Sequence, residues 1–111
     1  MHEYSIVKSM INLCEKHANG KAVDKVVVKI GKLGGVEPHF LKSCFDVFKE
    51  DTLCQDATME INIVDITIYC EDCKKEAKVE HFDFFCPNCD SPNTKTLTGQ
   101  EMYIEYIELK G

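Results

Sequence analysis

The chain reads CEDC at residues 70–73 and CPNC at residues 86–89, and twelve residues separate the two motifs. In each motif the two-residue spacing lets both sulfurs reach one ion while backbone amides of the tight turn point at them. Two such turns supply four thiolates at tetrahedral corners, which suits Zn²⁺ because this ion binds sulfur well and imposes no geometry of its own. All four coordination positions would then be filled, so the ion would be structural and not catalytic. The predicted zinc ligands are Cys70, Cys73, Cys86 and Cys89.

Two other interpretations of paired CxxC motifs are a pair of disulfides and a thioredoxin-like redox site. A redox CxxC opens a helix after a strand, and neither motif here is followed by a helical pattern. The first residues show no basic region and no apolar signal core, so we expect no secretory signal and a cytoplasmic location. In a reducing compartment, paired cysteines bind metal more readily than they oxidise.

Length and composition allow one domain, or a small domain with a metal-stabilised appendage. The chain has 111 residues, of which 44% are hydrophobic, and this is enough apolar material for a core. No apolar run approaches membrane-spanning length, so we expect no membrane association.

The charge balance argues against a nucleic-acid partner. The formal net charge is −6 and the sequence contains no arginine. Four thiolates with one dication would add two negative charges, giving about −8. Within residues 70–97, four lysines stand against six acidic residues, whereas a nucleic-acid-binding ribbon normally shows a basic stripe. We therefore expect no binding to DNA or RNA.

The hydrophobic pattern predicts two helices and a first strand. Residues 4–18 form the first predicted helix, and Asn19 with Gly20 supplies its stop signal. Residues 23–31 alternate like a strand, and Pro38 stands where the first turn of a second helix tolerates proline. The apolar face predicted for the first helix comprises Ile6, Met10, Leu13, Cys14 and His17.

Two further strands flank the cysteine-rich region. A strand is predicted over residues 57–69, and its apolar set shifts register near Val64, which predicts a bulge where the strand bends. A last strand covers residues 102–109. The expected fold is therefore α+β: a small three-stranded sheet with two helices on one face, into which a zinc ribbon over residues 70–97 is inserted.

The N-terminus offers a second set of metal ligands. The α-amine of Met1, the amide nitrogen of His2 and the His2 imidazole can close two adjacent chelate rings on one ion. Such a near-planar nitrogen set suits Ni²⁺ or Cu²⁺ better than Zn²⁺, and Glu3 could add a carboxylate.

These features together resemble the HypA/HybF family, the nickel-incorporation accessory proteins of [NiFe]-hydrogenase maturation. The resemblance covers the chain in order, and it is carried by the start MHEYS, the segments VVVKIG (26–31) and GVEPHFL (35–41), the two CxxC motifs, and GQEMYIEYIE (99–108). It implies a nickel-binding domain formed by residues 1–69 and 98–111 and a zinc domain formed by residues 70–97. It also implies nickel binding at the N-terminal amine and His2, with Glu37 as a weaker candidate.

The resemblance further implies what the protein does. A family member carries nickel to the [NiFe]-hydrogenase large-subunit precursor together with the GTPase HypB. No nucleophile–base pair, phosphate loop or open catalytic metal is visible in the chain, so we do not expect an enzyme. The alternative is a zinc-ribbon adaptor that holds other proteins together without transferring nickel. Monomer and homodimer both stay open.

The remaining cysteines and histidines have simpler interpretations. Cys14 and Cys44 lie on the apolar faces of the predicted helices, which favours core packing over metal or redox chemistry. Cys54 is expected to be partly buried and is given no role, while His17 and His39 are expected as surface or capping residues and not as metal ligands.

Overall fold

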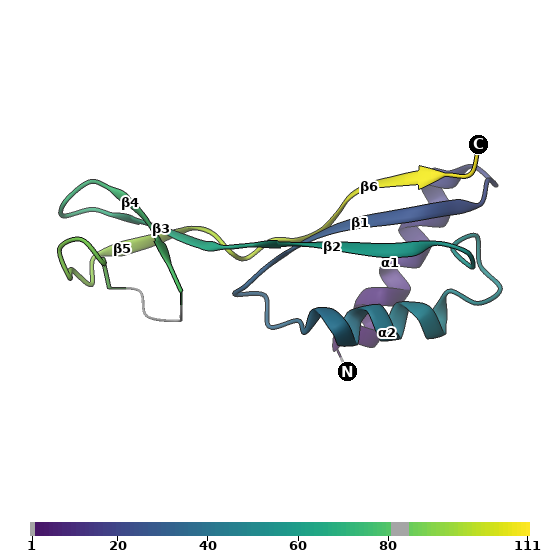
Figure 1. The fold of residues 1–111 in the computed structure, drawn as a ribbon, viewed down its shortest axis with the longest axis horizontal. Coiled ribbons are helices and arrows are strands. Elements are labelled where there is room, and N and C mark those ends of the chain that lie inside the picture. Colours follow the sequence, from purple (N-terminus) through teal and green to yellow (C-terminus); the bar gives the residue numbers. More distant parts are fainter. Residues whose placement is uncertain (1, 81–84) are drawn as a thin grey trace. The chain divides into compact units, whose positions relative to one another are not determined.

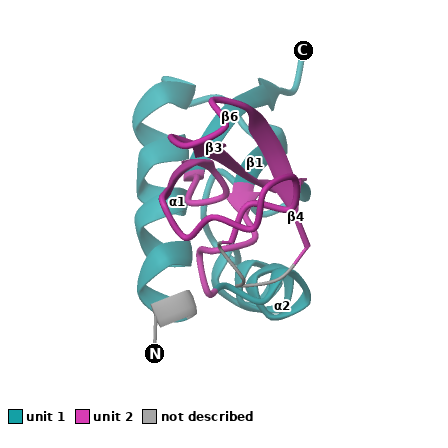
Figure 2. Ribbon diagram, turned by 90° about the vertical axis from the view of Figure 1, so that its left-hand side faces the viewer, with its two compact units in different colours: residues 1–29, 36–62, 103–111 teal, residues 30–35, 63–102 magenta. Residues whose placement is uncertain are grey.

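The structure is a computed structural model that describes residues 2–80 and 85–111, without the side chains of residues 2 and 3. The chain forms two compact units (Figure 2). Unit 1 comprises residues 1–29, 36–62 and 103–111, and unit 2 comprises residues 30–35 and 63–102. In the described part of the chain, no helix is both long enough and apolar enough to cross a membrane. The division into nickel-binding and zinc-ribbon domains with the boundaries given above stays a prediction.

Among the described residues, the fold consists of two small sheets and two helices (Figure 1). The first sheet has the strand order β2-β1-β6, and the second has the order β4-β3-β5. The α+β class with a three-stranded sheet, two helices and a separate cysteine-rich part is confirmed. The elements are α1 (His2–Ala18), β1 (Val23–Gly31), α2 (Pro38–Phe48), β2 (Thr58–Val64), β3 (Ile66–Cys70), β4 (Glu76–Val79), β5 (Thr94–Thr98) and β6 (Met102–Leu109).

The helix ends follow the expected local chemistry. Helix α1 stops at Ala18, and Asn19 and Gly20 adopt left-handed conformations with φ of 52° and 84°. Helix α2 begins with Pro38, whose missing N–H costs nothing at this position. The Glu37 carboxylate accepts a hydrogen bond from the Phe40 amide and thereby caps the free N-terminus of α2.

The buried face of α1 differs from the prediction. Leu13, which the prediction placed on this face, is 45% exposed and does not belong to the core. Apolar residues occupy adjacent positions of α1, so two different sets of them repeat with the period of a helix. The contacts within unit 1 decide which set is buried. The residues that α1 buries are Val7, Met10, Ile11, Cys14 and Ala18.

The core of unit 1 lies where both helices and the first sheet meet. Leu41 and Phe45 of α2 are fully buried. At the start of α1, the Tyr4 ring meets the Phe48 ring edge-on, with centroids 4.4 Å apart and an interplanar angle of 89°. This contact fixes the first turns of α1 against the end of α2. The buried residues of the central strand within unit 1 are Val23, Val26, Val27 and Val28.

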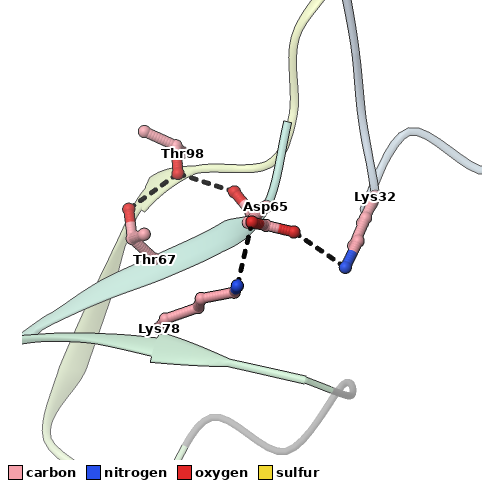
Figure 3. Close-up of polar contacts among 5 residues, drawn as sticks. All are labelled: Lys32, Asp65, Thr67, Lys78 and Thr98. Carbon is pink, nitrogen blue, oxygen red and sulfur yellow. Dashed lines mark hydrogen bonds and ion pairs between the residues drawn. The ribbon is translucent and has the colours of Figure 1, made fainter. Parts of the chain in front are cut away.

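The predicted strand over residues 57–69 is two strands that belong to different sheets. Strand β2 ends at Val64 and β3 begins at Ile66, so the predicted bend is a break at Asp65. In unit 2 the Asp65 carboxylate forms ion pairs with Lys32 (2.8 Å) and Lys78 (3.1 Å) (Figure 3). Its backbone carbonyl accepts a hydrogen bond from the Thr98 hydroxyl at 2.8 Å. Asp65, at which the strand breaks, is thus bound to a loop through Lys32, to β4 through Lys78 and to β5 through Thr98.

Residues 30–35, which follow most of β1 in sequence, belong to unit 2. Leu33 packs against the buried cluster of Ile66, Ile68 and Val79, and its amide donates to the Gly99 carbonyl at 2.7 Å. Gly31 lies so close to Gly99 that a Cβ atom on Gly31 would stand 2.0 Å from the Gly99 carbonyl oxygen. Only glycine permits this approach of two backbones.

Candidate metal centre

Four cysteines of unit 2 converge at the end of the second sheet. Their sulfurs all lie within 4.8 Å of one another, and the cluster comprises Cys70, Cys73, Cys86 and Cys89. Cys70 and Cys86 are buried, Cys73 is partly exposed and Cys89 is exposed. The structure therefore brings together all the cysteines that the sequence predicted as one metal site.

Two similar turns position these sulfurs. In the first turn, which follows β3, the Cys70 amide donates to the Lys75 carbonyl at 2.9 Å. In the second turn, the Cys86 amide donates to the Ser91 carbonyl at 2.9 Å. The residue after the second cysteine of each motif has positive φ, 58° at Lys74 and 63° at Asp90. Each CxxC motif thus forms a closed turn, and the two turns share the same backbone pattern.

Backbone amides point at the buried sulfurs, as the spacing predicted. The Cys73 amide lies 3.5 Å from the Cys70 sulfur, and the Asn88 amide lies 3.4 Å from the Cys86 sulfur. The Cys73 amide is the main reason that the pKa of the Cys70 thiol is lowered to about 7. These amides therefore stabilise thiolate, which is the form that binds metal.

The pKa of Cys89, the exposed member of the cluster, shifts in the opposite direction. The Ser91 backbone amide favours the Cys89 thiolate, but the contact with Cys70, burial, and the contacts with Cys86 and Cys73 together raise the pKa of Cys89 to about 12. Four sulfurs this close cannot all carry negative charge without a counterion. A bound dication supplies that charge, so the cluster is suited to exchanging its protons for a metal.

A polar clamp, which sequence reasoning missed, joins the two turns. The Asp72 carboxylate of the first turn accepts hydrogen bonds from the Ser91 hydroxyl and, at 3.4 Å, from the Asn93 side chain. The Ser91 bond is the main cause of the lowered pKa of Asp72. The Glu71 amide donates to the Asn93 carbonyl at 3.0 Å. The only sequence signal was a set of polar residues inside and just after the two motifs, which is common in loops.

The distances between the sulfurs fit a tetrahedral metal site. Metal–sulfur bonds of about 2.3 Å place tetrahedral sulfurs roughly 3.8 Å apart. The Cys70 and Cys89 sulfurs are 3.5 Å apart and the Cys73 and Cys86 sulfurs are 3.7 Å apart. An ion of zinc size can enter with small side-chain movements, and its bonding positions would all be filled by sulfur.

The predicted nickel ligands lie outside what the structure describes. Met1 is not among the described residues, nor are the side chains of His2 and Glu3. The Glu37 carboxylate is engaged in capping α2. His17 and His39 are exposed, as expected, and Cys14, Cys44 and Cys54 are all buried. Cys54 is thus more buried than its sequence context predicted, because the segment after α2 folds back onto α1.

Comparison with known proteins gives a match along the chain. Residues 1–109 match the family model described as "Hydrogenase/urease nickel incorporation, metallochaperone, hypA". The chain belongs to the HypA family. The hydrogenase maturation factor HypA of Aquifex aeolicus is 45% identical, covering 99% of this chain and 98% of the relative. HypA of Wolinella succinogenes is 40% identical, with coverages of 99% and 96%.

Solved structures of HypA proteins share the fold. The solution structure of the Ni metallochaperone HypA from Helicobacter pylori has a TM-score of 0.66 and 35% identity, with 96% of each chain covered. A second HypA solution structure has a TM-score of 0.74 and 34% identity, covering 99% of this chain and 97% of the other. The HypA fold therefore extends over nearly the full length of this chain.

Proposed function

We propose that this HypA protein is a nickel metallochaperone that delivers Ni²⁺ to the [NiFe]-hydrogenase large-subunit precursor, together with the GTPase HypB. The observation that carries the proposal is the family match over residues 1–109, which includes the Met1-His2-Glu3 start. The four-cysteine cluster would be filled by a resident ion, so the cargo needs another site. The N-terminal nitrogen ligands offer one.

The position of His2 at the start of a helix supports this nickel site. Helix α1 begins at His2, and the first amides of a helix have no acceptor within it. The His2 amide nitrogen is therefore not committed to the helix and can serve as a ligand between the Met1 amine and the His2 imidazole. The positive end of the helix dipole opposes a cation, which weakens binding. Weak binding suits a carrier that must release its cargo.

The first turns of α1 are attached to a folded scaffold. The Tyr4 ring contacts Phe48 of α2, and the Lys8 ammonium lies 5.3 Å from the centre of the Tyr4 ring. These contacts hold the turn that carries the proposed ligands on unit 1. Nickel can therefore bind there without depending on the cysteine cluster for its ligands.

We further propose that zinc is the resident ion of the four cysteines. Zn²⁺ accepts four thiolates at tetrahedral corners, and when bound it cross-links the two turns and balances their negative charge. Because four sulfurs converge and leave no position for water or substrate, the site is suited to structure and not to catalysis. The protein would accordingly act as a carrier and not as an enzyme.

Nickel titration calorimetry tests the cargo site. Wild-type protein should bind one Ni²⁺, whereas His2→Ala and a form with an N-terminal extension should lose this binding and keep their zinc. His17→Ala is the matched control, because His17 lies on the same helix and is exposed. Affinity for nickel should fall as the pH drops through about 6.5, because the imidazole must stay neutral to bind.

Equal binding by all four proteins would contradict the N-terminal site and favour the zinc-ribbon adaptor. Delivery itself is tested by mixing nickel-loaded protein with purified large-subunit precursor and HypB, and then measuring nickel in the separated precursor. We expect transfer from wild type and none from His2→Ala. Nickel that stays on wild-type protein would contradict the delivery role.

A further inference from the structure

The last strand of the first sheet has a free edge. Among the described strands, β6 pairs with β1 alone, because the order of this sheet is β2-β1-β6 (Figure 1). An edge strand presents a row of backbone amides and carbonyls that can pair with a strand of another chain. Strand β6 runs from Met102 to Leu109 and contains no proline, which would interrupt such pairing. An extended segment can therefore add a fourth strand here.

An apolar groove lies beside this edge within unit 1. It is formed by α1 and β6 and has a volume of about 210 Å³. Pockets for small molecules usually measure roughly 300–1,000 Å³, so this groove is better suited to a few side chains of a bound peptide. Two side chains of its walls, Leu13 and Tyr106, are 45% and 47% exposed. The lining residues are Leu13, Cys14, His17, Ile104, Tyr106 and Ile107.

The same strand carries unpaired negative charge. Because Ile104 and Tyr106 line the groove, strand alternation places Glu105 on the opposite face of the sheet. There its carboxylate accepts a hydrogen bond from the Asn62 side chain of β2 at 3.5 Å. Glu105 and Glu108 are both exposed, and within the described part of the chain neither forms an ion pair. Strand β6 contains no lysine that would balance them.

The groove and the charge together specify the side chains of an added strand. On one face of the sheet its side chains would enter the groove against Leu13 and Tyr106, which favours apolar residues. On the other face they would stand beside Glu105, which favours lysine or arginine. Since successive side chains of a strand alternate between the faces, the matching segment alternates apolar and basic residues.

A second copy of this chain fits the edge less well. Pairing β6 with its own copy would bring the glutamates of both strands into one strand pair. It would also join two chains that each carry a formal net charge of −6. A partner with basic residues removes both of these costs.

We propose that the free edge of β6 and the groove beside it form a docking site for an extended segment of a partner protein, in which apolar residues alternate with lysine or arginine. Backbone pairing with β6 would supply affinity, and the groove and the glutamates would supply selectivity. The proposal goes beyond nickel delivery and does not depend on the N-terminal nickel ligands.

Three synthetic peptides test the proposal on the full, zinc-loaded protein. The first is a labelled nine-residue peptide that alternates valine with lysine, and the second replaces lysine with glutamate. The third keeps the first sequence but is methylated at every backbone amide, so it cannot donate hydrogen bonds. Fluorescence anisotropy should show binding of the first peptide and about tenfold weaker binding of the other two. In ¹⁵N–¹H spectra, the first peptide should shift the amides of β6 and of residues 13–17 and slow hydrogen exchange in β6.

Substitutions on the two sides of the docking site provide matched pairs. Glu105→Lys should weaken the basic peptide about fivefold and strengthen the acidic one, whereas Glu60→Lys, an equal charge change at an exposed position of β2, should do neither. Leu13→Gln should weaken the basic peptide about fivefold. Its control is Val47→Gln on α2, where the side chain is 66% exposed. Circular dichroism checks that each variant is folded.

Several outcomes would overturn the proposal. They are no binding of the basic peptide, equal affinity for the basic and acidic peptides, full binding of the methylated peptide, and amide shifts that lie outside β6 and α1. Sedimentation velocity of the protein alone should show no association through this edge. A dimer that Leu13→Gln disrupts and Val47→Gln preserves would assign the surface to a second copy instead.

Discussion

The two units of this HypA protein are stabilised by different means. Unit 1 buries large apolar side chains of both helices and of β1, and this burial is the main favourable contribution to its folding. The buried cluster of unit 2 consists of Ile66, Ile68 and Val79, with Leu33 and Ala77 packed against it. Its other end is held by four sulfurs and the polar clamp of Asp72. The apolar unit should therefore keep its fold when the metal is removed, and the cysteine-rich unit should not.

Substitution of one metal ligand should separate the two units most clearly. Cys73→Ser removes a thiolate, and the binding energy of a structural zinc site, about 10–16 kcal/mol, is also folding energy. We expect residues 70–97 to lose their ordered structure while the α1, α2 and β1 signals persist in a ¹⁵N–¹H correlation spectrum. Elemental analysis should find one zinc per chain in wild type and much less in the variant. Cys44→Ser is the matched control, and a protease-resistant ribbon without zinc would contradict this prediction.

The backbone contact between Gly31 and Gly99 offers a second way to disturb unit 2. Gly31→Ala would place a Cβ atom 2.0 Å from the Gly99 carbonyl oxygen, so the two segments must move apart. We expect a loss of about 2–4 kcal/mol in the free energy of unfolding, measured by urea denaturation. Gly35→Ala is the control, because its φ of 71° disfavours alanine but no atom lies within 4 Å of the new group. A smaller loss for Gly31→Ala than for Gly35→Ala would show that the close approach is not needed.

The polar clamp should contribute less than the ligands but should be measurable in metal affinity. Asp72→Ala removes the acceptor of the Ser91 and Asn93 hydrogen bonds, so the two turns are less well held for the ion. We expect a tenfold to hundredfold loss of zinc affinity in competition with a chelator. Asp90→Ala is a useful comparison, because Asp90 lies in the second turn. Unchanged affinity in Asp72→Ala would show that the four sulfurs alone orient the site.

The ion pairs of Asp65 should have the smallest effect, and it should depend on pH. Hydrogen bonds and charge from Lys32, followed by Lys78, lower the pKa of Asp65, so the folded state stabilises its carboxylate. This contribution is present above the ordinary carboxyl pKa and is lost as the pH falls through the lowered folded value. The thermal midpoint of wild type should therefore exceed that of Asp65→Asn by a few degrees at pH 7, and the difference should shrink toward pH 3. A difference that grows on acidification would reverse the assigned sign.

Much of this architecture could be predicted from the sequence because it depends on local patterns. The CxxC spacing indicates that four sulfurs meet, strand alternation locates β1, and Asn19 with Gly20 ends α1. The buried stripe of α1 could not be predicted, because two apolar stripes share the helical period and tertiary packing selects between them. The break at Asp65 was visible only as a register shift of apolar residues.

The contacts that were missed involve residues far apart in the sequence. The bond between Asp72 and Ser91, the packing of Leu33 in unit 2, and the bond from the Leu53 amide to Glu15 depend on chain folding that no local pattern encodes. The roles of Met1, His2 and Glu3 came from resemblance and ligand chemistry, and they stay predictions.

The central place of β1 has a consequence for the order in which the protein can be assembled during synthesis. Strand β1 lies between β2 and β6, and β6 is the last strand of the chain (Figure 1). Residues 30–35 likewise form one compact unit with residues 63–102, which are synthesised later. Unit 1 therefore cannot complete its sheet on a nascent chain until residues 102–109 have been synthesised. The cysteine cluster needs both CxxC motifs, so it cannot form a complete metal site before residue 89 has emerged from the ribosome.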